Sequence, residues 1–382
     1  MLIRRTDRGL LASWWFTIDW LLLTAVLLLM AAGVIFSLAA SPPVAARIGL
    51  DNFHFFIRQL VFAVPAVLIM LMTSFLTPKL ARRICFGVFV TGLCLMVLAL
   101  FAGPEIKGAH RWIDLGPFNL QPSEMVKPSF VVAAAWLLAQ GLKRPDMPGQ
   151  LLAWGLFGMF LFLLVLQPDF GQAALMCAVW AVMLLIHGVS WLLVICLGIV
   201  ALIGAVAAYF TFPHVASRVN RFIDPERGDT FQVDTATRAF ENGGLFGTGP
   251  GAGSAKTILP DAHTDFIFAV VGEEFGLLAC ALLIGLVAFI VMRVLRHAQH
   301  SDDAFGALAM TGLATIIGLQ AVINMMVNVS LLPAKGMTLP FISYGGSSMI
   351  AMAFGIGLVL AINRRTVRAG STTGGWRPLV AA

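Results

Sequence analysis

The stretch GAHRWIDLGPFNLQPSEMVK, residues 108–127, is a polar segment in a chain that is otherwise overwhelmingly apolar. Basic, aromatic and turn-forming residues come first, and a long apolar run begins at its end. Pro122 at the first helical position and Glu124 in the first turn are typical of a helix start. The stretch therefore predicts a loop at one face of a membrane that continues into a membrane-spanning helix, and it forms the first candidate site.

Composition excludes a water-soluble globular protein. Hydrophobic residues make up 59% and charged residues 12% of the 382 positions, and the mean hydropathy is +0.91. About 20 apolar residues cross the hydrocarbon core as a helix. Runs of this kind predict an all-α polytopic membrane protein with ten spans, near residues 16–40, 54–76, 81–102, 124–142, 151–167, 170–187, 191–212, 266–292, 305–330 and 341–362.

Two of these runs raise an alternative. The fifth and sixth runs are slightly short and are separated only by Gln167, Pro168 and Asp169, so a re-entrant hairpin there would leave eight spans. The first run, in contrast, is too long for the apolar core of a signal peptide, and we expect it to remain as a span.

Basic residues in the short loops predict the orientation, because cytoplasmic loops are enriched in Lys and Arg. With ten spans, one face receives Arg4, Arg5, Arg8, Lys79, Arg82, Arg83, Lys143, Arg144, Arg293, Arg296, Arg364, Arg365, Arg368 and Arg377. We expect this face and both termini to be cytoplasmic, with 41–53, 103–123, 213–264 and 331–340 outside. Orientation explains most of the net charge of +6, and we expect no nucleic-acid binding.

The chain divides into a cytoplasmic N-terminal segment 1–15, a ten-helix membrane domain 16–365 and a cytoplasmic tail 366–382. A large extracytoplasmic loop, 213–264, separates the seventh and eighth spans, and loops of this length usually have a function. Its centre, GGLFGTGPGAGSAK at 243–256, lacks the GxxxxGK[ST] pattern of a phosphate-binding loop. We interpret these glycines as permitting tight turns and close backbone contacts, although their amide groups could also hold an anion.

Lys127 is the first candidate for chemistry, because it lies one turn inside the fourth span, beside Pro128. An ammonium within a membrane is costly and needs a partner. Glu124, three residues earlier, is the obvious partner. A structural ion pair and a contact to substrate are equally consistent with this spacing.

The second candidate site is LPDAHTDFIFAVVGEEFG, residues 259–276. Asp265 is expected at the boundary between water and hydrocarbon, where partial desolvation favours a carboxylate that accepts a proton near neutral pH. Thr264 and Asp265 could instead simply cap the eighth span. Glu273 is expected roughly 12 Å deeper than Asp265, and Glu274 points about 100° away from it, so the two should not face one cavity. Buried ion pairs and a proton relay are the alternatives for these glutamates.

The third candidate site is PAKGMTLPFISYGGSS, residues 333–348. Lys335 in a short outer loop opposes the predicted charge bias and indicates an anionic partner, such as a lipid headgroup. Ser343 and the small residues after it permit close packing at the head of the tenth span.

Taken in order, these segments resemble the shape, elongation, division and sporulation (SEDS) family of bacterial peptidoglycan polymerases, over about residues 16–365. The resemblance rests on HRWIDLGPFNLQPSE at 110–124, QPDFG at 167–171, GGLFGTGPG at 243–251, LPDAHTDFIFAVVGEE at 259–274 and KGMTLPFISYGGSS at 335–348. The last of these motifs is closer to the division member of the family than to the elongation member.

The resemblance implies glycosyl transfer between two lipid II molecules, with undecaprenyl pyrophosphate as the leaving group. By match to the family motif, Asp265 is the expected general base for the acceptor 4-hydroxyl. Positive charge on the pyrophosphate is expected from Arg111, Lys127, Lys256 and Lys335. The remaining expected substrate-binding residues are Trp112, Gln121, Ser123, Glu124, His263 and Ser343. A divalent cation at the pyrophosphate is left open, because no carboxylate pair at ligand spacing requires one.

The resemblance also implies partners and a location. The expected partners are a class B penicillin-binding transpeptidase and other membrane proteins of the division machinery, in the bacterial inner membrane at the septum. Two other functions remain. A lipid II flippase is suggested by Lys127, Glu273 and Glu274 and by helix breaks near Pro128 and Pro168, and a noncatalytic division scaffold would need none of this chemistry.

Overall fold

The computed structural model describes residues 9–106, 108–116, 118–211, 216, 217, 220, 231–333 and 336–369. In this part of the chain, ten helices are long and apolar enough to cross a membrane. They are α2 (Trp20–Arg47), α3 (His54–Ser74), α4 (Pro78–Ala102), α5 (Pro122–Lys143), α6 (Gly149–Leu166), α7 (Phe170–His187), α8 (Trp191–Thr211), α12 (Ile267–Gln299), α13 (Ala304–Asn328) and α14 (Gly346–Ala369). The predicted fold class is confirmed, and α6 and α7 are both long and apolar enough to span, which favours ten spans over eight.

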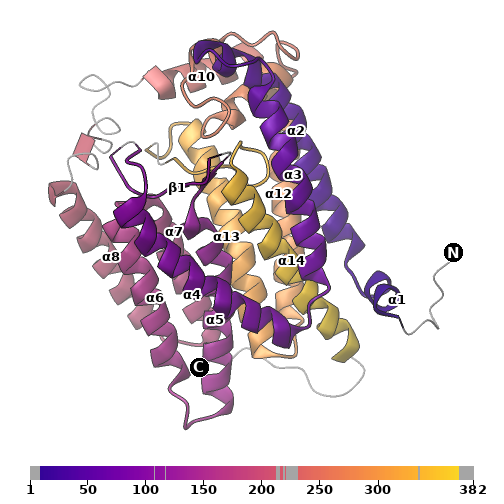
Figure 1. The fold of residues 1–382 in the computed structure, drawn as a ribbon, viewed down its shortest axis with the longest axis vertical. Coiled ribbons are helices and arrows are strands. Elements are labelled where there is room, and N and C mark those ends of the chain that lie inside the picture. The colour runs from indigo at the N-terminus through magenta and orange to yellow at the C-terminus, as the bar shows by residue number, and fades with distance from the viewer. Residues whose placement is uncertain are drawn as a thin grey trace.

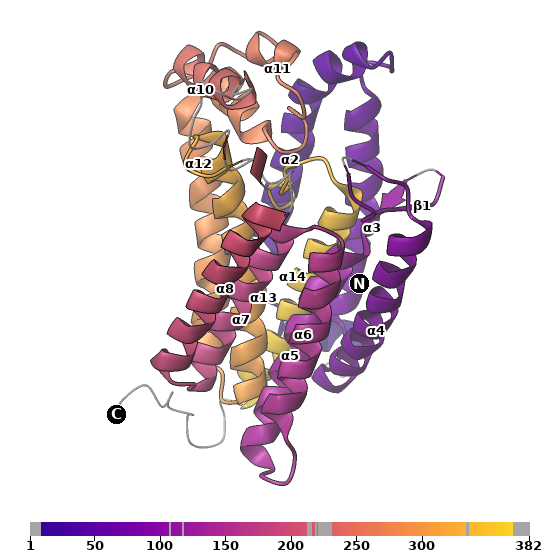
Figure 2. The ribbon, with the colours of Figure 1, turned by 90° about the vertical axis from the view of Figure 1, so that its left-hand side faces the viewer.

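The other described elements are short. They are α1 (Leu10–Trp15), α10 (Phe231–Gly243), α11 (Ala255–Ile258) and the antiparallel pair β1 (Ile113–Asp114) and β2 (Asn119–Leu120). The long helices run side by side along the long axis of the molecule, while α10, α11 and the β pair lie toward one end (Figures 1 and 2). The loops that contain the polar motifs lie at the same end.

Three helices form the centre of the bundle. In its most apolar segment α14 has 83% of its residues buried, and α5 and α13 each have 72%. Only 6% of the corresponding segment of α8 is buried, and α8 lies at the outer edge of the bundle in Figure 1. A helix enclosed on all sides is surrounded by protein rather than lipid, so α5, α13 and α14 can carry polar groups that find protein partners.

The first span begins at Trp20 instead of residue 16, because Asp19 ends the preceding turn and caps α2. Its carboxylate accepts a hydrogen bond from the Leu22 amide at 3.1 Å and contacts Arg293 and His297 of α12. Burial opposes ionisation of Asp19, but hydrogen bonds from His297, Arg293 and the Leu22 amide outweigh it and hold the pKa of Asp19 below its ordinary value. Because that pKa is lower in the folded chain, ionised Asp19 stabilises the fold at neutral pH and loses this contribution only in strongly acidic solution.

Contacts between helix ends place the predicted basic loops at one face of the bundle. Arg293 near the end of α12 binds Asp19 at the start of α2, at 2.8 Å. Lys143 at the end of α5 binds Asp303, which precedes α13, at 2.8 Å. The segregation of charge thus has a structural counterpart, while the assignment of this face to the cytoplasm stays a prediction.

The last span begins at Gly346, five residues later than expected. Phe341 has a positive φ of 64°, which does not continue into a helix. The Ser343 hydroxyl accepts a hydrogen bond from the Leu339 amide at 2.7 Å and donates one to the Thr264 carbonyl at 2.6 Å. These contacts hold 339–345 as an ordered loop above α14.

The glycine-rich segment 243–256 is packed against α12, as the close-contact interpretation predicted. The helix is interrupted at Gly276, which has φ 77° and ψ 178°. The freed Leu277 amide donates to the Gly244 carbonyl at 2.9 Å. A β-carbon on Gly247 would lie 2.2 Å from the Glu274 carbonyl oxygen, so the segment reaches the helix only without a side chain there.

We predict that Gly276→Ala lowers the free energy of unfolding by at least about 2 kcal/mol, because its backbone conformation is almost restricted to glycine. The added β-carbon would also lie 2.4 Å from the Leu245 carbonyl oxygen. The measurement is the thermal unfolding midpoint of the purified protein in detergent. Gly285→Ala is the matched control, since it lies in the same helix with no neighbour within 4 Å of the new atom. Equal midpoints for the two variants would contradict the prediction.

Candidate functional site

The three polar motifs of the sequence meet at one end of the bundle, and the segment 336–348 lies between the other two. On one side, the Ser347 hydroxyl accepts from the Gln121 amide at 3.1 Å. On the other side, the Tyr344 amide donates to the His263 carbonyl at 2.9 Å. The motifs therefore belong to one site, which consists of a buried cluster around Lys127 and a turn that carries Asp265.

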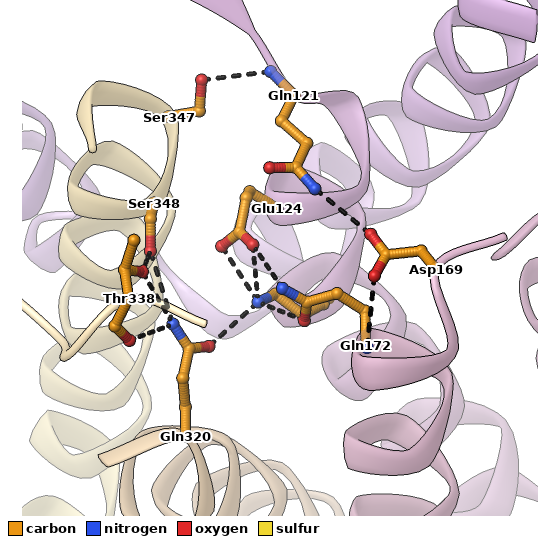
Figure 3. Close-up of polar contacts among 9 residues, drawn as sticks. Gln121, Glu124, Asp169, Gln172, Gln320, Thr338, Ser347 and Ser348 are labelled. Atoms are coloured by element: carbon orange, nitrogen blue, oxygen red, sulfur yellow. Dashed lines mark hydrogen bonds and ion pairs between the residues drawn. The ribbon is translucent and has the colours of Figure 1, made fainter. Parts of the chain in front are cut away.

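The buried cluster consists of Glu124, Lys127, Gln172 and Gln320 and is hereafter the Lys127 cluster (Figure 3). Lys127 is fully buried, and its ammonium lies 2.9 Å from the Glu124 carboxylate. The same ammonium donates to the side-chain carbonyls of Gln172 and Gln320, each at 3.0 Å. The expected ion pair is present, and all three N–H groups of the ammonium have partners.

Sequence reasoning missed both glutamines of this cluster. Gln172 accepts from Lys127 through its carbonyl and donates its amide group to Glu124 at 2.9 Å, so each end of the carboxamide faces the charge that suits it. The available signal was a glutamine inside an apolar helix, because such a group needs a polar partner in the membrane. The partner itself could not be identified from the local sequence.

The turn between α6 and α7 connects the Lys127 cluster to the loop before α5, which contains Arg111 and Gln121. Asp169 caps α7. Its carboxylate accepts a hydrogen bond from the Gln121 side-chain amide at 3.3 Å and lies 3.5 Å from the Arg111 guanidinium. Burial raises the pKa of Asp169, and the neighbouring charge of Arg111 opposes this effect. Arg111 also donates to the carbonyls of Gln167 and Pro168. The QPDFG motif thus supplies the hydrogen-bond acceptors and the carboxylate that bind Arg111, whose side chain is 21% exposed.

Asp265 lies in a turn, residues 261–266, that leads into α12. Its amide donates to the Asp261 carbonyl at 3.1 Å, and its carbonyl accepts from Asn324 and Asn328, each at 2.9 Å. The residue is half-buried, and a β-carbon on Gly336 would lie 3.6 Å from the Asp265 carboxylate oxygen. A glycine beside this carboxylate leaves room on that side.

The structure does not place Thr264 or Asp265 at the cap position of α12. The residue at the cap position is Phe266, and its side chain makes no capping hydrogen bond. The Ala269 amide in the first turn of α12 donates instead to the Asn328 side chain, at 3.0 Å. The start of the helix is therefore held from α13.

The other expected substrate-binding residues have different surroundings. His263 packs its ring against Phe55, with ring centroids 4.1 Å apart, and Ser343 is buried in the hydrogen bonds described above. Ser123 is buried in the first turn of α5, whereas Trp112 is half-buried in the loop before β1. Lys335 lies outside the described residues.

Lys256 is separate from the Lys127 cluster and from the Asp265 turn. It is buried, forms an ion pair with Glu274 and donates to the Ala39 carbonyl at 3.1 Å. Its charge is therefore neutralised within the fold.

Glu273 and Glu274 both find partners in the glycine-rich segment, in agreement with the buried-pair alternative: Glu273 accepts from the Ser254 hydroxyl at 3.2 Å and Glu274 pairs with Lys256. Glu273 accepts from the amides of Ser254 and Ala255, each at 2.9 Å, and Glu274 accepts from the Gly251 amide at 2.9 Å. Both carboxylates thus bind the glycine-rich segment, because that segment wraps around α12 next to its interruption at Gly276. The anions on these loop amides are the protein's own glutamates.

The site is tightly closed around the Lys127 cluster. A cavity of about 10 Å³, room for about one water molecule, borders Glu124 and Pro128. No group of three or more His, Cys, Asp or Glu side chains within the described part of the chain is arranged to hold a metal ion.

Fold and site together define a ten-helix membrane protein with a polar site where loops meet at one end of the bundle. The chain belongs to the FtsW/RodA/SpoVE family of cell cycle proteins, which it matches over residues 19–368. This match confirms the resemblance found in the sequence motifs.

Curated relatives and solved structures extend the comparison. The chain is 44% identical over 362 residues to the Caulobacter vibrioides protein named "Probable peptidoglycan glycosyltransferase FtsW", covering 94% of this chain and 93% of the relative. A Trichlorobacter lovleyi protein of the same name is 35% identical, with 90% and 93% covered.

Two solved structures share the fold. One is a chain of a peptidoglycan synthase complex that coordinates polymerization and crosslinking, with a TM-score of 0.74, 28% identity and coverage of 91% of this chain and 98% of that one. The other is the rod shape determining protein RodA of Thermus thermophilus, with a TM-score of 0.68, 28% identity and coverage of 92% and 98%.

We predict that Lys127→Met destabilises the protein by about 3 to 5 kcal/mol, because the Glu124 carboxylate would be buried without its counter-charge. Adding Glu124→Gln should restore much of that loss. The check is the thermal midpoint of the single and double variants in detergent. Lys143→Met is the control, because its pair with Asp303 has side chains 57% and 50% exposed, and exposed pairs contribute about 0 to 1 kcal/mol. A double variant no more stable than Lys127→Met would contradict the pairing argument.

Proposed function

We propose that the protein is a peptidoglycan glycosyltransferase that polymerises lipid II during cell division. The names of its relatives support the activity, and the solved synthase complex supports the class of reaction. The proposed mechanism rests on the position of Asp265. This residue is half-buried, and its backbone carbonyl accepts hydrogen bonds from the buried side chains of Asn324 and Asn328. Glu124 pairs with Lys127 and Glu273 binds the loop amides, so both have structural roles in the fold.

Asp265 is proposed as the general base. It would accept the proton of the GlcNAc 4-hydroxyl while that oxygen forms a bond to the anomeric carbon of the second lipid II molecule. The bond from the anomeric carbon to the pyrophosphate breaks in the same step, and undecaprenyl pyrophosphate leaves. Positioned proton transfer of this kind contributes about 10² to 10⁴ in rate.

The departing pyrophosphate needs positive charge and hydrogen-bond donors. Arg111 is the described basic residue best suited to this role, because its guanidinium is partly exposed while Asp169 and the carbonyls before it hold its direction. Lys335 remains a candidate from its place in the sequence motif. Lys127 would contribute indirectly, because its ammonium is bound within the Lys127 cluster. Lys256 is a structural residue, because it forms an ion pair with Glu274.

The proposal includes partners and a location. Lipid II is the substrate, and a class B penicillin-binding transpeptidase is the proposed partner that crosslinks the new glycan, together with other membrane proteins of the division machinery. The proposed location is the inner membrane at the septum, with both termini cytoplasmic. The ten membrane helices and the coordinated polymerization and crosslinking in the similar complex support this assembly.

The residues that suggested a lipid flippase have structural roles in the fold. Pro128 lies inside α5, which continues without interruption from Pro122 to Lys143. Glu273 and Glu274 hold the glycine-rich segment, and Lys127 is neutralised by Glu124. These contacts do not require a transport function. The assay below distinguishes a polymerase from a lipid flippase and from a noncatalytic scaffold.

We predict that Asp265→Asn lowers glycan polymerisation at least about 100-fold, because the amide cannot accept the hydroxyl proton. The measurement is the formation of glycan strands from purified lipid II by this protein with its cognate transpeptidase, at matched folding and complex yield. Asp261→Asn is the control, since it makes the same chemical change four residues earlier in the same turn and Asn tolerates the positive φ of 53° at that position.

Each outcome of this assay decides between functions. Polymer from the wild type and Asp261→Asn, with almost none from Asp265→Asn, supports a polymerase with Asp265 as base. Equal polymer from all three removes Asp265 from the chemistry. No polymer from any of them, with a competent partner and lipid, favours the flippase or the scaffold, which a lipid II translocation assay separates.

A further inference from the structure

Three side-chain amides form a row on one face of α13. Gln320, Asn324 and Asn328 are spaced four residues apart, which places them above one another on a helix. All three are buried, with 0%, 1% and 0% of their surfaces exposed. Carboxamides in a membrane helix are costly unless they find partners, and these three find theirs in the loops of the site. They are called the amide row below.

Asn324 and Asn328 hold the Asp265 turn. Both side-chain amides donate to the Asp265 carbonyl, each at 2.9 Å, so both lone pairs of that oxygen have a donor. The Asn328 side-chain oxygen accepts from the Ala269 amide at 3.0 Å, and the same amide also donates to the Phe266 carbonyl at 3.1 Å, so it is shared between the two oxygens. Asn328 therefore restrains the chain on both sides of the first turn of α12.

The same row reaches the segment that lies beside the Asp265 carboxylate. Asn324 donates to the Met337 carbonyl at 2.6 Å. Met337 follows Gly336, where an added β-carbon would lie 3.6 Å from the Asp265 carboxylate oxygen. One side chain thus sets the Asp265 backbone and the facing wall of the site relative to each other.

Gln320 extends the row into the Lys127 cluster. It accepts from the Lys127 ammonium at 3.0 Å and donates to the Thr338 carbonyl at 3.1 Å. Figure 3 shows Gln320 and Thr338 pointing toward each other. The buried charge of α5 is consequently connected through α13 to the loop that borders Asp265.

We propose that Asn324 and Asn328 are positioning residues for Asp265, and that they contribute to turnover by fixing the backbone from which the carboxylate projects. This inference rests on the proposed role of Asp265 as general base. The physical reason is geometric, since a proton acceptor that is misplaced by about 1 Å can cost about 100-fold in rate. The cap of α12 does not supply this restraint, because Phe266 makes no capping hydrogen bond.

The test compares Asn324→Ala and Asn328→Ala with wild type, in complex with the cognate transpeptidase and with lipid II as substrate. We expect kcat to fall by about 10 to 100-fold while KM changes by less than about two-fold, because the substrate contacts remain. Hydrogen exchange should accelerate in peptides that cover 261–269 and stay unchanged in α5 and α14. Thr315→Ala is the matched control, since its hydroxyl donates to the Thr311 carbonyl of the same helix and makes no other hydrogen bond within the described residues.

The outcomes separate this inference from the proposed function. If wild type makes no polymer, or Asp265→Asn is as active as wild type, the proposed function or its base fails first. If Asp265→Asn is inactive but both asparagine variants keep wild-type kcat, the positioning role is overturned. A raised KM at constant kcat would overturn it in favour of substrate binding. Failure of both variants to fold, with Thr315→Ala folded, would overturn it in favour of a general structural role.

Discussion

The arrangement of the outer half of the bundle depends on the buried ammonium of Lys127. A charge without water must be neutralised and fully hydrogen-bonded, or it costs several kcal/mol. Its acceptors come from α5 itself, from α7 through Gln172 and from α13 through Gln320. These helices can satisfy the ammonium only in one mutual arrangement, so a single charge restricts how three helices pack.

That restriction is transmitted outward by side chains that each contact two elements. Gln320 contacts Lys127 and Thr338, while Asn324 contacts Met337 and Asp265. Apolar packing alone is poor at fixing loops in a membrane protein, because lipid tails are as apolar as leucine. Directional hydrogen bonds from the central helices therefore do most to place the loops of the site.

The acidic residues of the outer face have distinct tasks. Glu124 neutralises Lys127, Asp169 caps α7 and receives Arg111, and the pair at 273 and 274 holds the glycine-rich segment. In Asp265 it is the backbone that is held by α13, while the carboxylate lies beside a glycine.

The sequence by itself determined the properties that depend on neighbouring residues. Ten membrane helices follow from local hydropathy, the start of α5 follows from Pro122, and the Glu124 and Lys127 pair follows from its spacing of three residues. Only the tertiary structure decided what joins distant positions. Gln320 meets Lys127 across 193 residues, and Asn328 meets Asp265 across 63. It also brought both Glu273 and Glu274 into contact with one loop, because the glycine-rich segment packs closely around α12 and reaches side chains that point in different directions from the helix.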